Sequence, residues 1–300
     1  MVSVAGKVKH ASLQREQRST FIVFILPGLL LYCVFLIFPI LMGIVYSLMD
    51  WNGISPNFNF IGFENYTKLF TDRKFLSALL FNVRYTLMLI VGIVGISIML
   101  ALLLNRELKA RSFFRTLYFF PAILSMITIS LIFNQIFYYV LPSVGKQLGI
   151  SWLSSNVLAS RDTAIYGILF VHLWQGVALP TLLFLAGLQT IPTELYEAAS
   201  IDGANAWHQF KSITFAYLLP TLSVVLVLVV KQGLMVFDYV KAMTEGGPGG
   251  ATQSIALLIY TNGFERNKYS YSIAQAIMTG ILIAMISVFQ IKLTSKKKVE

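Results

Sequence analysis

Charged side chains inside long apolar runs are the residues of this sequence best placed to do chemistry. Arg84, Lys231 and Asp238 all lie in such runs. A charge at membrane depth is costly, so it usually pairs with another group or lines a polar path. Asp238 and Lys241 are three residues apart and could pair on one helix face. Lys231 has no acid nearby, so it either extends to the membrane surface or faces an interior cavity.

The runs that carry these charges are long enough to cross a membrane. The chain of 300 residues is 57% hydrophobic and 12% charged, whereas soluble domains carry about 25% charged residues. A spanning helix needs roughly 20 apolar residues. The first run is too long for the core of a signal peptide, so we expect it to be retained. The sequence predicts an all-α membrane protein with six transmembrane helices at 20–49, 76–104, 113–141, 163–189, 213–243 and 270–293.

The positions of the basic residues predict the orientation. With both termini in the cytoplasm, the internal segments hold thirteen Lys and Arg residues and the external loops hold seven. This bias fits the positive-inside rule. It also accounts for much of the net charge of +10 without nucleic acid as a partner. We expect a cytoplasmic tail at 1–19, a first helix with its external loop at 20–75, a membrane core at 76–293 and a basic cytoplasmic tail at 294–300.

A patterned segment separates the fourth and fifth runs, in the sequence EAASIDGANAW at 197–207. Gly203 interrupts it, because glycine adopts a left-handed turn at little cost. Trp207, Phe210 and Ile213 follow at intervals of three, as on a second short helix. We therefore expect two short helices on the cytoplasmic surface. The alternative on physical grounds alone is a loop that only joins two spans.

Several kinds of chemistry are excluded by missing motifs. The Gly-Lys pairs at Gly6 and Gly145 are not part of a phosphate-binding loop. The three histidines have no metal-ligand spacing, and the single cysteine, Cys33, allows no internal disulfide. His172 in the fourth run is either a buried structural residue or a polar group lining a path. We expect no ATP hydrolysis, no cofactor and no catalytic site in this chain.

The segment at 197–220 resembles a known family. Glu197-Ala198-Ala199, Asp202-Gly203-Ala204 and the later Phe210, Ile213 and Pro220 are similar to the EAA signature of the membrane subunits of binding-protein-dependent ABC importers. The resemblance continues in FIGFENYTKLFTDRKF (60–75), FFRTLYFFPAILS (113–125) and FDYVKAMTEGGPGGATQSIALLIYTNGF (237–264). The last of these is similar to the sugar-importing, maltose-permease-like branch.

The resemblance implies a function and a set of partners. The protein would be a permease subunit in the cytoplasmic membrane of a prokaryote, importing a carbohydrate by alternating access. Two cytosolic ATPase subunits would drive it, together with a second, different permease subunit and an external solute-binding protein. The EAA segment would be the coupling helix that docks on an ATPase, with roles for Glu197, Ala198, Ala199, Asp202, Gly203 and Ala204.

Carbohydrates are neutral and rich in hydroxyl groups, so their path favours amides, aromatic faces and a few charged donors. The candidates are Asn134, Gln135, Tyr138, Trp174, Gln175, Lys231 and Gln232. For the aromatic residues, contact with lipid or with another helix is the alternative. Arg84 and Lys231 would also suit an anion, so an importer of glycerol phosphate or of another small polar solute is a second reading. An ion-driven secondary transporter is a third, although we find no internal repeat.

Overall fold

The computed structural model describes residues 21–106 and 111–295. These residues form helices joined by loops, with one isolated bridge between Met49 and Phe60 and no strand. The all-α prediction is confirmed for this part of the chain. Five helices are long and apolar enough to cross a membrane, and a bent pair brings the number to six. The predicted tail at 1–19 and residues 296–300 lie outside the described residues.

Helices follow one another along the chain in this order. The first span is Phe21–Ser47, which ends as α2 (Phe38–Ser47). The elements after it are α3 (Glu64–Leu69), α4 (Arg73–Asn105), α5 (Arg111–Ile123), α6 (Met126–Gln135), α7 (Leu141–Gln147), α8 (Ala164–Gly176), α9 (Ala178–Leu188), α10 (Thr193–Ile201), α11 (Ala206–Gln209), α12 (Phe215–Leu234), α13 (Asp238–Met243), α14 (Ile255–Tyr260) and α15 (Tyr269–Ser295). Single π-helical turns, Ile136–Val140 and Phe210–Thr214, join α6 to α7 and α11 to α12.

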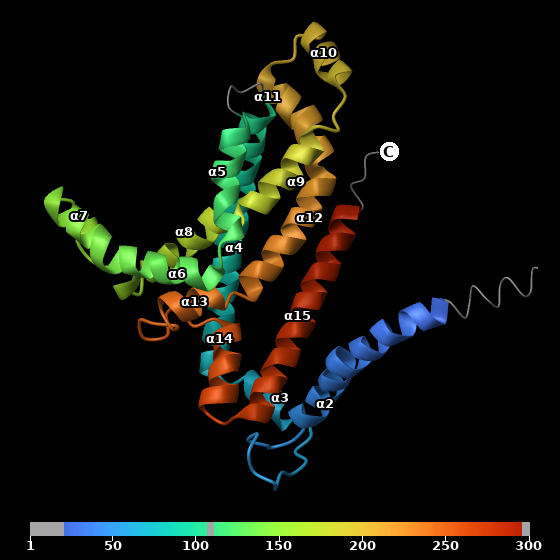
Figure 1. Ribbon diagram of the computed structural model, residues 1–300, viewed down its shortest axis with the longest axis vertical. Helices are drawn as coiled ribbons and strands as arrows, with labels where there is room; N and C mark the ends of the chain where they lie inside the picture. Colours follow the sequence, from blue (N-terminus) through green and yellow to red (C-terminus); the bar gives the residue numbers. More distant parts are fainter. Residues whose placement is uncertain (1–20, 107–110, 296–300) are drawn as a thin grey trace, which may run out of the picture.

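The long helix α4 is the centre of the fold. Asp72 caps it by accepting a hydrogen bond from the Lys74 N–H at 2.8 Å. Tyr85, Leu89 and Ile93 on α4 are fully buried, and α4 packs against α9 and α12. Figure 1 shows α4, α12 and α15 running lengthwise, with α10 at one end and α3 at the other.

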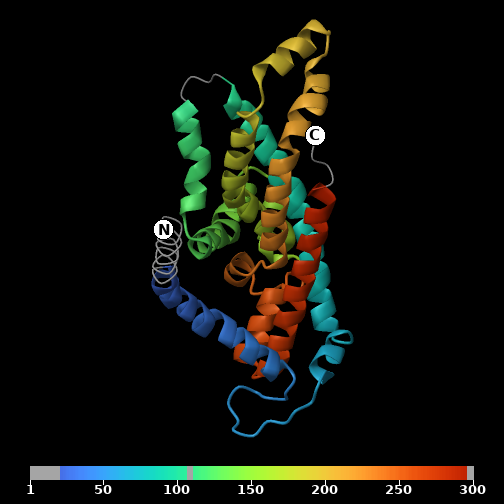
Figure 2. The same ribbon diagram turned by 90° about the vertical axis from the view of Figure 1, so that its right-hand side faces the viewer.

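The first span extends away from this core. In both views it diverges from the other helices (Figures 1 and 2), and its most apolar 18 residues are entirely unburied. Only its last part, α2, packs on another long helix, α15. Its large apolar side chains, such as Phe24 and Phe35, are exposed. This surface therefore needs lipid or another protein to cover it.

Two of the predicted spans are wrong as continuous helices. The run at 113–141 divides at Leu124 and Ser125 into α5 and α6. The run at 213–243 ends at Leu234, and α13 begins separately at Asp238. Apolar composition does not show such breaks, because the freed backbone groups are satisfied by side chains distant in sequence. Asn82 on α4 satisfies the carbonyls at the end of α12. Its side-chain amide donates to the carbonyls of Gly233 (3.1 Å) and Leu234 (2.8 Å).

The fourth span is bent by 46° at Val177, between α8 and α9. Pro180 explains the bend, because it has no N–H to bond the carbonyl four residues earlier. The next carbonyl, that of Val177, accepts from both the Thr181 N–H at 3.0 Å and Thr181 Oγ1 at 2.7 Å, and Ser97 Oγ donates to the same oxygen from α4 at 3.3 Å. The bend directs α9 toward the end of the molecule that carries α10 (Figure 1).

Gly233 lies where α12 packs closely against α4. A Cβ atom at Gly233 would lie 2.5 Å from Thr86 Oγ1 and 2.9 Å from Thr86 Cα. Because the second atom belongs to the backbone, a side chain here forces the helices apart. We expect Gly233→Ala to lower the free energy of unfolding by about 1–3 kcal/mol, measured as a lower melting temperature of the purified protein.

The matched control for this variant is Gly95→Ala on α4, where a Cβ atom would meet nothing within 4 Å. We expect it to keep or raise the melting temperature, since alanine favours a helix over glycine. Equal melting temperatures for Gly233→Ala and wild type would contradict close packing at this crossing.

Candidate functional site: a polar cavity and an exposed terminal helix

A cavity of about 460 Å³, with several polar side chains in a mainly apolar wall, lies where α12 ends. Its walls come from the end of α5, the starts of α6, α9 and α13, the second half of α8, the last turns of α12 and the break at 235–237. The break itself creates the site, because it turns the chain across the helix bundle. The polar residues in the lining are His172, Gln175, Lys231, Gln232, Asp238 and Tyr239.

Two opposite charges share this cavity without an ion pair. Lys231 lies in the last turn of α12 and Asp238 is the first residue of α13. Neither takes part in a salt bridge among the residues that the structure describes. The predicted pair of Asp238 with Lys241 is wrong, because Lys241 bonds to other acids. The cavity therefore offers both a cationic donor and an anionic acceptor to a solute.

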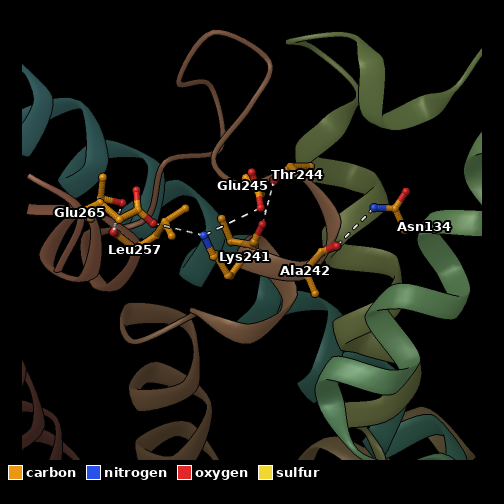
Figure 3. A network of polar contacts seen from close by, with 9 residues as sticks. Asn134, Lys241, Ala242, Thr244, Glu245, Leu257 and Glu265 are labelled. Atoms are coloured by element: carbon orange, nitrogen blue, oxygen red, sulfur yellow. Dashed lines mark hydrogen bonds and ion pairs between the residues drawn. The ribbon is translucent and has the colours of Figure 1, made fainter.

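Lys241 anchors the other side of α13 (Figure 3). Its Nζ lies 3.4 Å from Glu265 Oε1 and 3.8 Å from Glu245 Oε1. It also lies 5.3 Å from the centre of the Tyr260 ring, within reach of a cation–π interaction. These contacts join α13 to the segment after α14. Asn134 on α6 completes the support by donating to the Ala242 (3.2 Å) and Met243 (2.9 Å) carbonyls.

A chain of buried polar contacts orders the wall formed by α8. The Tyr239 hydroxyl donates to Gln175 Oε1 at 2.7 Å, and Gln175 Nε2 donates to the Leu124 carbonyl at 2.8 Å. That carbonyl is at the break between α5 and α6. His172 stacks on Tyr239 with ring centres 4.4 Å apart, and its Nδ1 shares a 2.9 Å hydrogen bond with Tyr85. His172 is thus buried and structural, and it also lines the cavity.

The structure brings together three of the seven predicted path residues: Gln175, Lys231 and Gln232 all line the cavity. Asn134 supports the end of α13 from outside it. Trp174 lies in a separate apolar groove between α4, α5 and α8. Gln135 and Tyr138 are exposed on the continuation of α6. Arg84 is exposed as well, with its Nη2 3.4 Å from the Tyr166 hydroxyl.

Sequence reasoning missed Tyr239 as a cavity residue. The signal that could have found it is its place next to Asp238 within FDYVK. Because the two residues are adjacent at the start of a short helix, both can reach a cavity at the chain break. When 213–243 is taken as one continuous span, this position is hidden.

The second site is α10, at the far end of the molecule (Figure 1). The helix has no buried residue, and Glu197 and Ala198 are exposed. Gly203 has φ +76°, and the Ala204 N–H donates to the Ala199 carbonyl at 2.9 Å. This is the hydrogen bond of a Schellman turn, which closes a helix with a left-handed glycine. The predicted glycine bend is confirmed.

The second short helix of this segment is not independent, contrary to the prediction. α11 continues through the π-helical turn Phe210–Thr214 into α12, and Ala206–Leu234 is one candidate span. Two hydrogen bonds join α10 to this continuous helix. Tyr196 Oη and Thr214 Oγ1 lie 2.8 Å apart, and Gln209 Nε2 donates to Ser200 Oγ at 3.0 Å. α10 is therefore tied directly to the helix that continues into α12, which carries Lys231 at its other end.

The fold and the two sites define a multi-pass membrane transport subunit: a bundle with a polar cavity and an exposed helix linked to the cavity wall. Residues 93–298 match the family described as "Binding-protein-dependent transport system inner membrane component". The chain belongs to this family. It is therefore an inner-membrane permease subunit of an ABC importer and not an enzyme.

Individual relatives agree with this assignment. The chain is 46% identical over 276 residues to the multiple sugar-binding transport system permease protein MsmF of Streptococcus mutans, covering 92% of this chain and 95% of the relative. It is 33% identical over 297 residues to the trehalose/maltose transport system permease protein MalF of Thermococcus litoralis, covering 97% of each. A solved bacterial importer of the polysaccharide alginate has the same fold, with a TM-score of 0.81, 21% identity and coverage of 97% and 100%.

Proposed function

We propose that this subunit moves a carbohydrate, and more narrowly an oligosaccharide, into the cell in an ATP-driven importer. The observation that carries the proposal is the 46% identity, over nearly the whole chain, to a permease named for sugar transport. A relative named for sn-glycerol-3-phosphate transport, from Agrobacterium fabrum, is 26% identical over 275 residues. The carbohydrate reading is therefore favoured over the glycerol phosphate reading.

The cavity at the end of α12 is the proposed solute path in this subunit. Lys231 and Gln232 supply donors, Asp238 supplies an acceptor, and Tyr239 supplies an aromatic ring. This mixture suits a neutral solute with many hydroxyl groups, which both donate and accept. A phosphate would be attracted by Lys231 but repelled by Asp238, so the carboxylate supports a neutral substrate.

The helix α10 is the proposed docking element for a cytosolic ATPase subunit. Its exposure, the small side chains of Ala198 and Ala199, and the exposed Trp207 nearby (71%) support a protein partner. One such helix engages one ATPase. A second permease, of a different sequence, would engage the other ATPase and cover part of the exposed first span. Closing of the two ATPases would move α10, and with it α12, and so alternate the cavity between the two sides.

In this proposal α10 and both termini lie in the cytoplasm and residues 48–63 lie outside. The thirteen-to-seven bias of basic residues supports it. In a Cys33→Ala background, we expect Asn57→Cys to react with a membrane-impermeant maleimide in intact cells. Ser3→Cys and His208→Cys should react only after permeabilisation. Labelling of Ser3→Cys or His208→Cys in intact cells would contradict the orientation, and with it the docking role of α10.

The substrate class is tested with the solute-binding protein that works with this permease. Calorimetric titration with neutral oligosaccharides, monosaccharides and glycerol phosphate compares the rival solutes directly. We expect tight binding of a neutral oligosaccharide. Binding of glycerol phosphate alone would contradict the proposal and favour the anionic reading.

A further inference from the structure

An apolar groove of about 660 Å³ lies between α4, α5 and α8, and we call it the lateral groove. α4 supplies lining residues between 96 and 104, α5 supplies them between 117 and 121, and α8 supplies most of the rest. Leu103, Leu117 and Phe170 in the lining are exposed. The groove shares no lining residue with the cavity at the end of α12. It is therefore a separate feature of the membrane-facing surface.

Packed side chains give the lateral groove its shape. The Trp174 ring packs edge-on against Phe133 with ring centres 5.3 Å apart, and Phe133 packs edge-on against Phe170 at 6.0 Å. On the α4 side, Gly92 lets Leu173 approach the helix, because a Cβ atom at Gly92 would lie 2.5 Å from Leu173 Cδ2. These contacts fix the aromatic and aliphatic walls of the groove, so it is formed before any ligand binds.

The length of the lateral groove matches one leaflet of a bilayer. Leu173 packs at the level of Gly92 on α4, and the lining continues along α4 to Leu104. At 1.5 Å per residue, the rise from residue 92 to residue 104 is about 18 Å. A single leaflet supplies about 15 Å, half of a hydrocarbon layer about 30 Å thick. The groove is thus long enough for one extended acyl chain.

Basic residues lie next to one end of the lateral groove. Arg106 directly follows α4, two residues after Leu104, and α5 begins with Arg111 and carries Arg115 one turn later. Arg106 is exposed and takes part in no salt bridge among the described residues. The end of α4 and the start of α5 lie toward the end of the molecule that carries α10 (Figure 1), which is cytoplasmic in the proposed orientation. Cytoplasmic leaflets are rich in anionic lipids, and basic pockets between membrane helices bind their headgroups.

We propose that the lateral groove binds an anionic phospholipid, with one acyl chain along α4, α5 and α8 and the phosphate paired with Arg106. A helix of another subunit could also cover the apolar walls. The cation at the end of the groove favours the lipid, because arginine binds phosphate oxygens with two parallel hydrogen bonds. The bound chain contacts Trp174 and the bend at Val177, so the lipid supports the direction in which α9 leaves the bend. This inference does not depend on which solute the importer carries.

The experiment uses the complete importer in nanodiscs that hold equal amounts of phosphatidylcholine and phosphatidylglycerol. A trace of one of the two lipids carries a photoreactive diazirine on an acyl chain, and mass spectrometry locates the labelled peptides after irradiation. We expect photoreactive phosphatidylglycerol to label 96–104 and 117–121 about fivefold more than photoreactive phosphatidylcholine does, the preference that one cation near a headgroup supplies. Arg106→Gln should abolish most of this preference. Leu103→Trp, which fills the groove, should lower labelling by both lipids.

Two matched controls carry the same kinds of change outside the lateral groove. Leu87→Trp alters an exposed leucine of α4, and Lys292→Gln alters an exposed basic residue of α15. Both should be labelled like wild type. Equal labelling of wild type by the two lipids, or an unchanged preference in Arg106→Gln, would overturn the inference. Absence of label from the groove in the complete importer would show that a second permease covers it, and would overturn the inference as well. The proposed function stands in each case.

Discussion

Glu197→Lys and Gly203→Val are each expected to abolish stimulation of ATP hydrolysis by the loaded binding protein. Glu197 is an exposed anion on α10, and replacing it by a cation turns a partner ion pair into a repulsion that costs about 2–5 kcal/mol when desolvated. Gly203 has φ +76°, which a β-branched residue strongly disfavours. The measurement is the ATPase rate of the reconstituted complex with and without loaded binding protein.

Conservative variants separate coupling from general damage. Gly203→Asn should retain stimulation, because asparagine tolerates the left-handed conformation and a Cβ atom there meets nothing within 4 Å. Glu197→Gln should lose less than Glu197→Lys, since it removes the attraction without adding a repulsion. The fold should persist in all four, because α10 buries no residue. Wild-type stimulation in both Glu197→Lys and Gly203→Val would make α10 a simple connector.

Lys231→Met and Asp238→Asn are expected to reduce uptake of the solute by about tenfold or more. Each removes one charged group from the cavity, and a hydrogen bond to a charged group contributes about 1.5–3 kcal/mol. Neither group forms a salt bridge within the described chain, so both variants should assemble normally with the ATPases. The measurement is initial uptake of radiolabelled solute at equal amounts of complex.

Arg84→Met is the matched control for Lys231→Met. Arg84 is also a cation at membrane depth, but it lies outside the cavity and contacts Tyr166. Its loss should leave uptake nearly unchanged. If Lys231→Met and Arg84→Met behave alike, Lys231 acts only as a residue that reaches the membrane surface, and the cavity is not the path.

The helical class, the number of spans and the glycine turn at Gly203 could be predicted from the sequence. Apolar run length and the left-handed preference of glycine are local properties, and they appear directly in the residues. The division of 113–141 and 213–243 could not be predicted in this way. It depends on Asn82 and Gln175, which satisfy carbonyls at the ends of distant helices.

The cavity could be predicted only in part, for the same reason. Lys231 was recognisable as a charge without a local acid. The i+3 spacing of Asp238 and Lys241 instead suggested a pair, because Glu265 is distant in sequence from Lys241 and invisible to local reasoning. Asn134 has the amide that a sugar path needs, but its amide is used by the carbonyls at the end of α13.

The most direct test of the account is uptake of a labelled neutral oligosaccharide, one that the binding protein retains, into proteoliposomes holding the complete importer. ATP is supplied on the ATPase side and the binding protein on the opposite side. The account predicts accumulation that requires both, and that persists when ion gradients are dissipated by ionophores. Accumulation without ATP, or its collapse with the ion gradient, would contradict an ATP-driven carbohydrate permease.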